Sequence, residues 1–91
     1  MDDAPKTLNC LRLNIAAIDS EILSLVKQRL DLCRAMTPLK TENKVPLRNT
    51  DQEQIVLDRS ASWAQQQGED QGRAQAFTRL LMEWGLFVQK K

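Results

Sequence analysis

The feature that most constrains how this chain can fold is a long heptad stripe of apolar residues in its first half. The stripe residues are spaced alternately by three and four, and we call them the seam: Leu8, Leu11, Ile15, Ile18, Ile22, Leu25, Arg29, Leu32, Met36 and Leu39. This spacing is typical of a helix face that packs along another helix. A helix over residues 7–41 would be about 50 Å long. Because 91 residues cannot cover so long a helix, we expect the seam to pack on a second copy of the chain in a homodimer.

The rest of the sequence is also helical. It contains only three glycines and three prolines, with no alternating β pattern and no hairpin signal. Breaks near residues 44–49 and 68–72 divide the chain into helices at roughly 7–41, 50–66 and 72–89. We therefore predict an all-α fold, one domain over residues 1–91, with residues 1–6 as a disordered tail.

Two local signals qualify the helix boundaries. Pro38 lies inside the first predicted helix, where proline removes a hydrogen bond and costs about 3 kcal/mol. The helix should therefore kink near Arg34 or end there, which leaves the direction of Lys40 open. The second helix opens with Thr50 and, three residues on, Glu53. This is the spacing of a capping box, in which the Thr hydroxyl caps an N–H group and the Glu reaches back.

The third predicted helix has one apolar stripe, formed by Phe77, Leu80, Leu81, Trp84 and Val88. Gly85 and Gln89 continue the row that Phe77 and Leu81 begin. We expect Trp63 and Trp84 to serve the core rather than a ligand, because the chain has few other large side chains.

Composition excludes several classes of function. Thirteen basic and twelve acidic residues give a net charge of +1, so no basic excess favours nucleic acid or an anionic membrane surface. No apolar run is long enough to span a bilayer and the N-terminus is no signal peptide, which predicts a cytoplasmic protein. Without histidine there is no His-based triad or metal site. Cys10 and Cys33 form no metal-type pair, so we expect free thiols, no metal and no cofactor.

Arg29 is a charged residue in the apolar seam. A buried guanidinium needs an anion, which is either an acid on another helix or an anionic ligand. Arg12 and Lys40 each follow a seam residue on the same edge. If two antiparallel copies cross near Leu23, the partner subunit's Arg12 lies opposite Arg34, between Arg29 and Lys40. Three cations would then converge on a compact ligand with two carboxylates, which Arg binds in bidentate fashion.

The ordered set of residues resembles the all-helical (AroQ-type) chorismate mutase family over nearly the whole chain. The resemblance rests on Leu8-Asn9-Cys10-Leu11-Arg12, Ile15-Ala16-Ala17-Ile18-Asp19, Leu25-Val26-Lys27-Gln28-Arg29, Lys40, Val45-Pro46-Leu47-Arg48, Glu53 and Gln89. It implies three helices, an intertwined homodimer, and two active sites that each take an Arg from the partner. It also implies the Claisen rearrangement of chorismate to prephenate, a pericyclic step that needs no nucleophile, metal or cofactor.

The resemblance also implies roles for individual residues. The partner subunit's Arg12 and Arg29 would clamp the two carboxylates of the substrate. Lys40 would hold a carboxylate and donate to the ether oxygen, where Gln89 would be the second donor. Glu53 would accept from the ring hydroxyl.

Three predicted substrate-binding positions depart from the family's usual residues. Asn49 stands where an Asp is common, Gln52 where an Arg is common, and Gly85 where a Ser is common. Each lost charge-assisted contact costs about 1.5–3 kcal/mol.

Three interpretations follow. The first is a chorismate mutase with an altered pocket, helped by an activating partner enzyme.

The second interpretation is a sibling activity on a related dianion, as 4-amino-4-deoxychorismate mutase or isochorismate pyruvate lyase. The third is a non-catalytic helical dimer that binds a metabolite or a partner. We favour the first, because a purely structural dimer would not need a cation in its seam.

Overall fold

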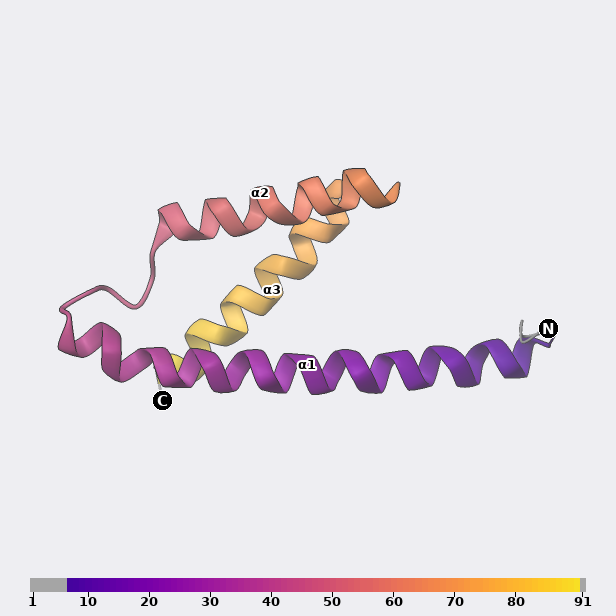
Figure 1. The fold of residues 1–91 in the computed structure, drawn as a ribbon, viewed down its shortest axis with the longest axis horizontal. Helices are drawn as coiled ribbons and strands as arrows, with labels where there is room; N and C mark the ends of the chain where they lie inside the picture. Colours follow the sequence, from indigo (N-terminus) through magenta and orange to yellow (C-terminus); the bar gives the residue numbers. More distant parts are fainter. Residues whose placement is uncertain (1–6, 91) are drawn as a thin grey trace.

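The computed structural model describes residues 7–90, which form three helices and no strand (Figure 1). Helix α1 spans Leu8–Glu42, α2 spans Thr50–Gln67 and α3 spans Gln71–Gln89. The all-α prediction is confirmed, and the helix ends differ from the expected ones by at most one residue. The predicted tail at residues 1–6 lies outside the described residues.

The three helices form an open arrangement in which α3 is the common neighbour. Helix α2 runs antiparallel to α1. Helix α3 then crosses from the end of α2 toward the C-terminal half of α1 (Figure 1). Within the described residues α3 packs on both other helices, whereas α1 and α2 do not contact each other. The N-terminal half of α1 extends beyond the other two helices.

The core of the single chain is small. Its buried apolar residues are Val26, Leu30, Leu57, Ala64 and Val88. The radius of gyration is 17.1 Å, whereas a compact domain of this length would have about 12 Å. The described chain therefore leaves much apolar surface without a partner.

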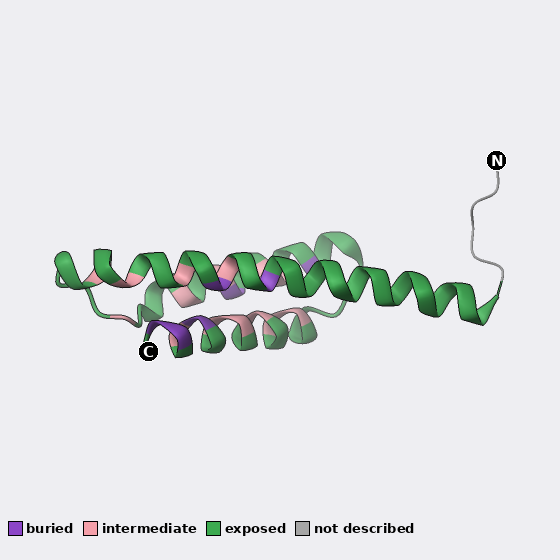
Figure 2. Cartoon of the chain, turned by 90° about the horizontal axis from the view of Figure 1, so that it is seen from below, coloured by how far each residue is buried: buried purple, intermediate pink, exposed green. Residues whose placement is uncertain are grey.

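Half of the large apolar side chains on this open surface belong to the seam, and they are 41% to 68% exposed. The residues of α1 that face α3 are instead Val26, Leu30 and Cys33. Figure 2 shows the N-terminal half of α1 exposed on all sides. Trp63 and Trp84 are 55% and 47% exposed, so within one chain the expectation that they serve the core is wrong. The small core and open seam are what a chain that packs on a second copy would present.

The start of α2 corrects the predicted capping box. The N-cap is Asn49, whose Oδ1 accepts from the Gln52 backbone N–H over 3.0 Å. Thr50 is the first helical residue, and the Glu53 carboxylate pairs with Arg48 instead of reaching back. Asn is at least as good an N-cap as Thr, and a guanidinium is a stronger partner for a carboxylate than a backbone N–H.

Helix α1 continues through Pro38 to Glu42, so the alternative that it ends near Arg34 is wrong. Proline lacks the N–H that would bond the carbonyl one turn back, and its ring crowds that carbonyl, but the helix continues past it. The helix end is then secured by Asn43, whose backbone N–H and Nδ2 both donate to the Leu39 carbonyl, over 3.0 and 2.8 Å. Lys40 therefore lies within α1, in its last turn.

Candidate active site

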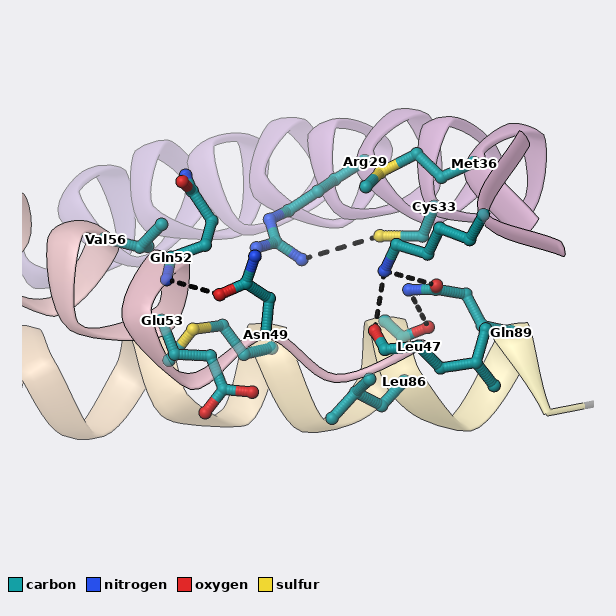
Figure 3. Close-up of a pocket in the computed structure, with 13 residues that line it drawn as sticks. Arg29, Cys33, Met36, Leu47, Asn49, Gln52, Glu53, Val56, Leu86 and Gln89 are labelled. Atoms are coloured by element: carbon teal, nitrogen blue, oxygen red, sulfur yellow. Dashed lines mark hydrogen bonds between the residues drawn. The ribbon is translucent and has the colours of Figure 1, made fainter. Parts of the chain in front are cut away.

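A cavity of about 230 Å³ opens between the C-terminal half of α1, the start of α2 and the end of α3 (Figure 3). It is lined by all the sequence-predicted site residues except Arg12, namely Arg29, Lys40, Asn49, Gln52, Glu53, Gly85 and Gln89. Further lining residues are Cys33, Met36, Leu47, Val56, Met82 and Leu86. The fold thus brings residues from all three helices and from the loop before α2 to one place.

Lys40 and Gln89 meet at one end of this cavity. Lys40 Nζ donates to Gln89 Oε1 over 2.9 Å and to the Leu47 carbonyl over 2.6 Å. Gln89 Nε2 donates to the Gly85 carbonyl over 3.2 Å, and the residue is only 7% exposed. An ammonium has three donor hydrogens and an amide has two. One N–H of each group therefore remains for a ligand.

Arg29 lines the cavity from α1, about three turns before Lys40, and is half-buried. Its Nη1 donates to the Leu81 carbonyl over 3.0 Å and lies 3.9 Å from Cys33 Sγ. These contacts use Nη1. The edge formed by Nε and Nη2, which is the fork that matches a carboxylate, remains available to a ligand. Within residues 7–90 no carboxylate pairs with Arg29 or Lys40.

Glu53 is the one carboxylate on the lining, and it is paired within the chain. Arg48 Nε lies 3.0 Å from Glu53 Oε2, and Arg48 Nη2 lies 3.1 Å from Oε1. Because Arg48 balances Glu53, the unpaired charge at the cavity is that of Arg29 and Lys40. The cavity is therefore suited to an anion.

Asn49 and Gln52 line the cavity at the start of α2 and are exposed. The cap bond fixes the orientation of the Asn49 amide, since its oxygen must be the atom that accepts from the Gln52 backbone N–H. The amide nitrogen then points away from this bond, toward the side of Arg29 (Figure 3). Asn49 thus offers the cavity a donor.

Gly85 is buried and has no side chain to offer a ligand. The space beside it is occupied by Cys33, a lining residue that the sequence reasoning missed. Helix spacing could have found it, because Cys33 lies one turn after Arg29 on the same face. Leu47 was also missed, and its contribution is a backbone carbonyl that carries no side-chain signal.

Arg12 does not reach the cavity of its own chain. It is exposed in the projecting half of α1, and its distance from Arg29 along the helix is about 25 Å. Two apolar cavities adjoin Arg29 in the space beside α3. One of about 270 Å³ lies against α1, and one of about 470 Å³ lies against α2. Both are lined by Phe77 and Leu81.

Other features of the described chain concern metals, thiols and membranes. Residues 7–90 contain no cluster of three His, Cys, Asp or Glu side chains that could hold a metal ion. Cys10 and Cys33 are both free thiols. No helix in the described part of the chain is long and apolar enough to cross a membrane.

Comparison with known protein families gives a match. Residues 11–90 match the sequence model of the family described as chorismate mutase type II. The match covers all three helices apart from the first residues of α1. No curated protein matches the chain.

Proposed function

The chain belongs to the chorismate mutase type II family, and on this premise we propose that it converts chorismate to prephenate. The observation that carries the proposal is the unpaired charge of Arg29 and Lys40 on the lining of one small cavity. Unpaired, partly buried cations are costly unless an anion joins them. A compact dianion supplies the negative charge that both cations lack.

The proposed reaction is an intramolecular rearrangement, so the site must fold the substrate and stabilise charge. Holding the reacting carbons in contact removes much of the entropic part of the barrier. Negative charge then grows on the breaking ether oxygen, and fixed donors at that point lower the barrier further. The remaining N–H groups of Lys40 and Gln89 are the proposed donors, and neither has to be reoriented.

Arg29 and the partner subunit's Arg12 are the proposed carboxylate clamps. The Nε–Nη2 edge of Arg29 remains available for a bidentate contact. The clamping Arg12 must belong to the second copy, because Arg12 lies about 25 Å along the helix from Arg29 of its own chain. Antiparallel copies that cross near Leu23 bring the partner subunit's Arg12 opposite Arg34.

The proposed homodimer places the projecting half of one α1 in the space between α1 and α2 of the other copy. The two apolar cavities beside Arg29 provide room for seam side chains there. The exposed seam residues, among them Ile15 and Ile18, supply the apolar surface that would fill them. Burial of this surface would stabilise the dimer and complete each site.

The neighbourhood of Asn49 favours chorismate over its 4-amino analogue. Glu53 is held by Arg48, and the Asn49 amide oxygen is held by the helix cap. The polar group that remains is an amide N–H, which suits a neutral hydroxyl oxygen and not an ammonium. We assign Asn49, Gln52 and Glu53 to the substrate ring on this basis.

The test is the loss of the chorismate diene absorbance with purified protein, with the product identified by chromatography. Isochorismate and 4-amino-4-deoxychorismate are run alongside. We expect prephenate from chorismate and slower or no conversion of the other two. Conversion of an analogue without conversion of chorismate would assign the protein to a sibling reaction. Absence of turnover with all three would contradict the proposal.

A further inference from the structure

Cys33 and Gly85 meet where α1 packs on α3 at the wall of the candidate active site. A Cβ atom placed on Gly85 would lie 2.9 Å from Cys33 Sγ and 3.4 Å from Arg29 Nη1. The first distance is well below the roughly 3.5–4.0 Å at which nonpolar atoms make favourable contact. The missing side chain at position 85 is therefore the space into which the Cys33 thiol fits.

The same thiol lies against the guanidinium of Arg29. Arg29 Nη1 is 3.9 Å from Cys33 Sγ and 3.0 Å from the Leu81 carbonyl. Cys33 lies one turn beyond Arg29 on α1, and Leu81 one turn before Gly85 on α3. The Nη1 end of Arg29 is thus held between the two helices close to the point where Gly85 lets them approach.

We propose that Cys33 is a positioning residue for Arg29 and that Gly85 is the gap that admits it. The role rests on the proposed function, in which the other edge of Arg29 binds a substrate carboxylate. A cysteine on a helix has few alternative χ1 rotamers, because the one near +60° clashes with the preceding turn. A side chain at position 85 must therefore turn the thiol away or separate the helices, and either change moves Arg29.

The proposal predicts a specific pattern in a double-mutant cycle. Gly85→Ala alone should raise KM for chorismate by about tenfold or more, since a misplaced carboxylate clamp weakens binding. In a Cys33→Ala background the same substitution should change KM by no more than about threefold, because the clash is absent. Cys33→Ser, which keeps a polar atom of similar size, should raise KM less than Cys33→Ala. Gly72→Ala is the control on α3 for KM and for the position of Arg29, since its Cβ would meet the Asp70 side chain at the first turn of the helix, away from Arg29.

Two measurements without substrate separate this proposal from the proposed function. Thermal unfolding of the parent, Gly85→Ala, Cys33→Ala and the double variant reports whether the two positions are coupled in the free enzyme. The side-chain N–H resonances of Arg29 in ¹⁵N-arginine-labelled protein, assigned with Arg29→Lys, report whether the guanidinium moves. We expect a shift in Gly85→Ala, a smaller one in the double variant, and none in Gly72→Ala.

If the effects of Gly85→Ala and Cys33→Ala on KM and on Tm are additive, the proposed fit of Cys33 beside Gly85 is overturned. Coupled unfolding with unmoved Arg29 resonances would overturn the positioning role. If the parent protein does not turn over chorismate, the proposed function fails, but the resonances and the unfolding cycle still decide whether Cys33 and Gly85 position Arg29.

Discussion

Lys40 Nζ and Gln89 Oε1 lie 2.9 Å apart and join α1 to the end of α3. The bond fixes both partners, because the Gln89 amide nitrogen is itself bonded to the Gly85 carbonyl. A buried amide with both ends bonded cannot turn without leaving a polar group unpaired. The free hydrogens of Lys40 and Gln89 are consequently two fixed donors close to each other, an arrangement suited to a single oxygen that gains negative charge.

Replacing Lys40 should remove most of the activity. Lys40→Met keeps the length of the side chain and deletes the ammonium, so we expect kcat to fall by at least about 100-fold. Gln89→Leu should also lower kcat, and the double variant should be little worse than Lys40→Met, because the two residues act as one unit. Steady-state kinetics with chorismate measures all three. Lys27→Met is the matched control, since among residues 7–90 Lys27 pairs with Asp31 alone, on the exposed face of α1. Full activity in Lys40→Met would exclude the proposed donor role.

Mixing two inactive variants should restore part of the activity if the sites are shared between chains. Arg12→Ala and Arg29→Ala should each be inactive alone. With random exchange half of the dimers are hybrids, and each hybrid has one intact site of two, so the mixture should regain about one quarter of the parent activity. The assay follows chorismate loss after unfolding and refolding the chains together. Mass spectrometry of the native mixture verifies that hybrids formed, and hybrids without activity would contradict an Arg12 contribution from the partner.

The sequence predicts the features of this fold that depend on neighbouring residues better than those that depend on contacts between helices. The three helices and their ends follow from periodicity and from sparse breaks, which are local features. The gathering of Arg29, Lys40 and Gln89 around one cavity follows their expected places on helix faces and in the family pattern. Whether each performs its expected role remains a prediction.

The sequence reasoning failed where neighbouring groups compete or where helices approach closely. Asn49 displaced Thr50 as the N-cap, because Arg48 offers Glu53 a better partner than the backbone does. The fit of Cys33 beside Gly85 depends on the distance between two helices, which periodicity does not specify. The exposure of Trp84 reflects apolar surface left open in the single chain.

The surface ion pairs of Asp31 should make a small, pH-dependent contribution to stability. A hydrogen bond from Lys27, with support from Arg34, lowers the pKa of Asp31 from its usual value of 3.8. A lowered pKa in the folded state means that the stabilisation is present above the unfolded pKa and is lost as pH falls through the folded one. Asp31→Asn should therefore lower Tm slightly at pH 7, and the difference should shrink below about pH 4. Thermal unfolding at both pH values, with Glu21→Gln as the exposed control, checks this. A difference that grows on acidification would contradict the assignment.

The cap at the start of α2 can be separated from any contact between Asn49 and substrate. Asn49→Ala deletes the acceptor for the Gln52 N–H and should lower the free energy of unfolding by about 1 kcal/mol. Asn49→Asp keeps an acceptor of the same size and should stay close to the parent in stability. Its turnover should match or exceed that of the parent, since an Asp, the residue that the family pattern gives at this position, can accept from a ring hydroxyl. Chemical denaturation and kinetics on the same samples distinguish the two effects. Equal loss of stability in both variants would show that the cap bond is not the cause.

The open seam should determine the oligomeric state. Ile18 is 55% exposed in the single chain, yet a fully buried Ile contributes about 1.5–3 kcal/mol. Ile18→Lys places a charge where the proposed dimer is apolar, so we expect a monomer by sedimentation velocity and a Tm lowered by at least about 5 °C. Activity should be lost as well, because each site needs the partner subunit's Arg12. Ser20→Lys adds the same charge on the opposite face of α1 and should remain a dimer with parental Tm and activity. If Ile18→Lys sediments as a dimer and remains active, the two copies do not associate through the seam.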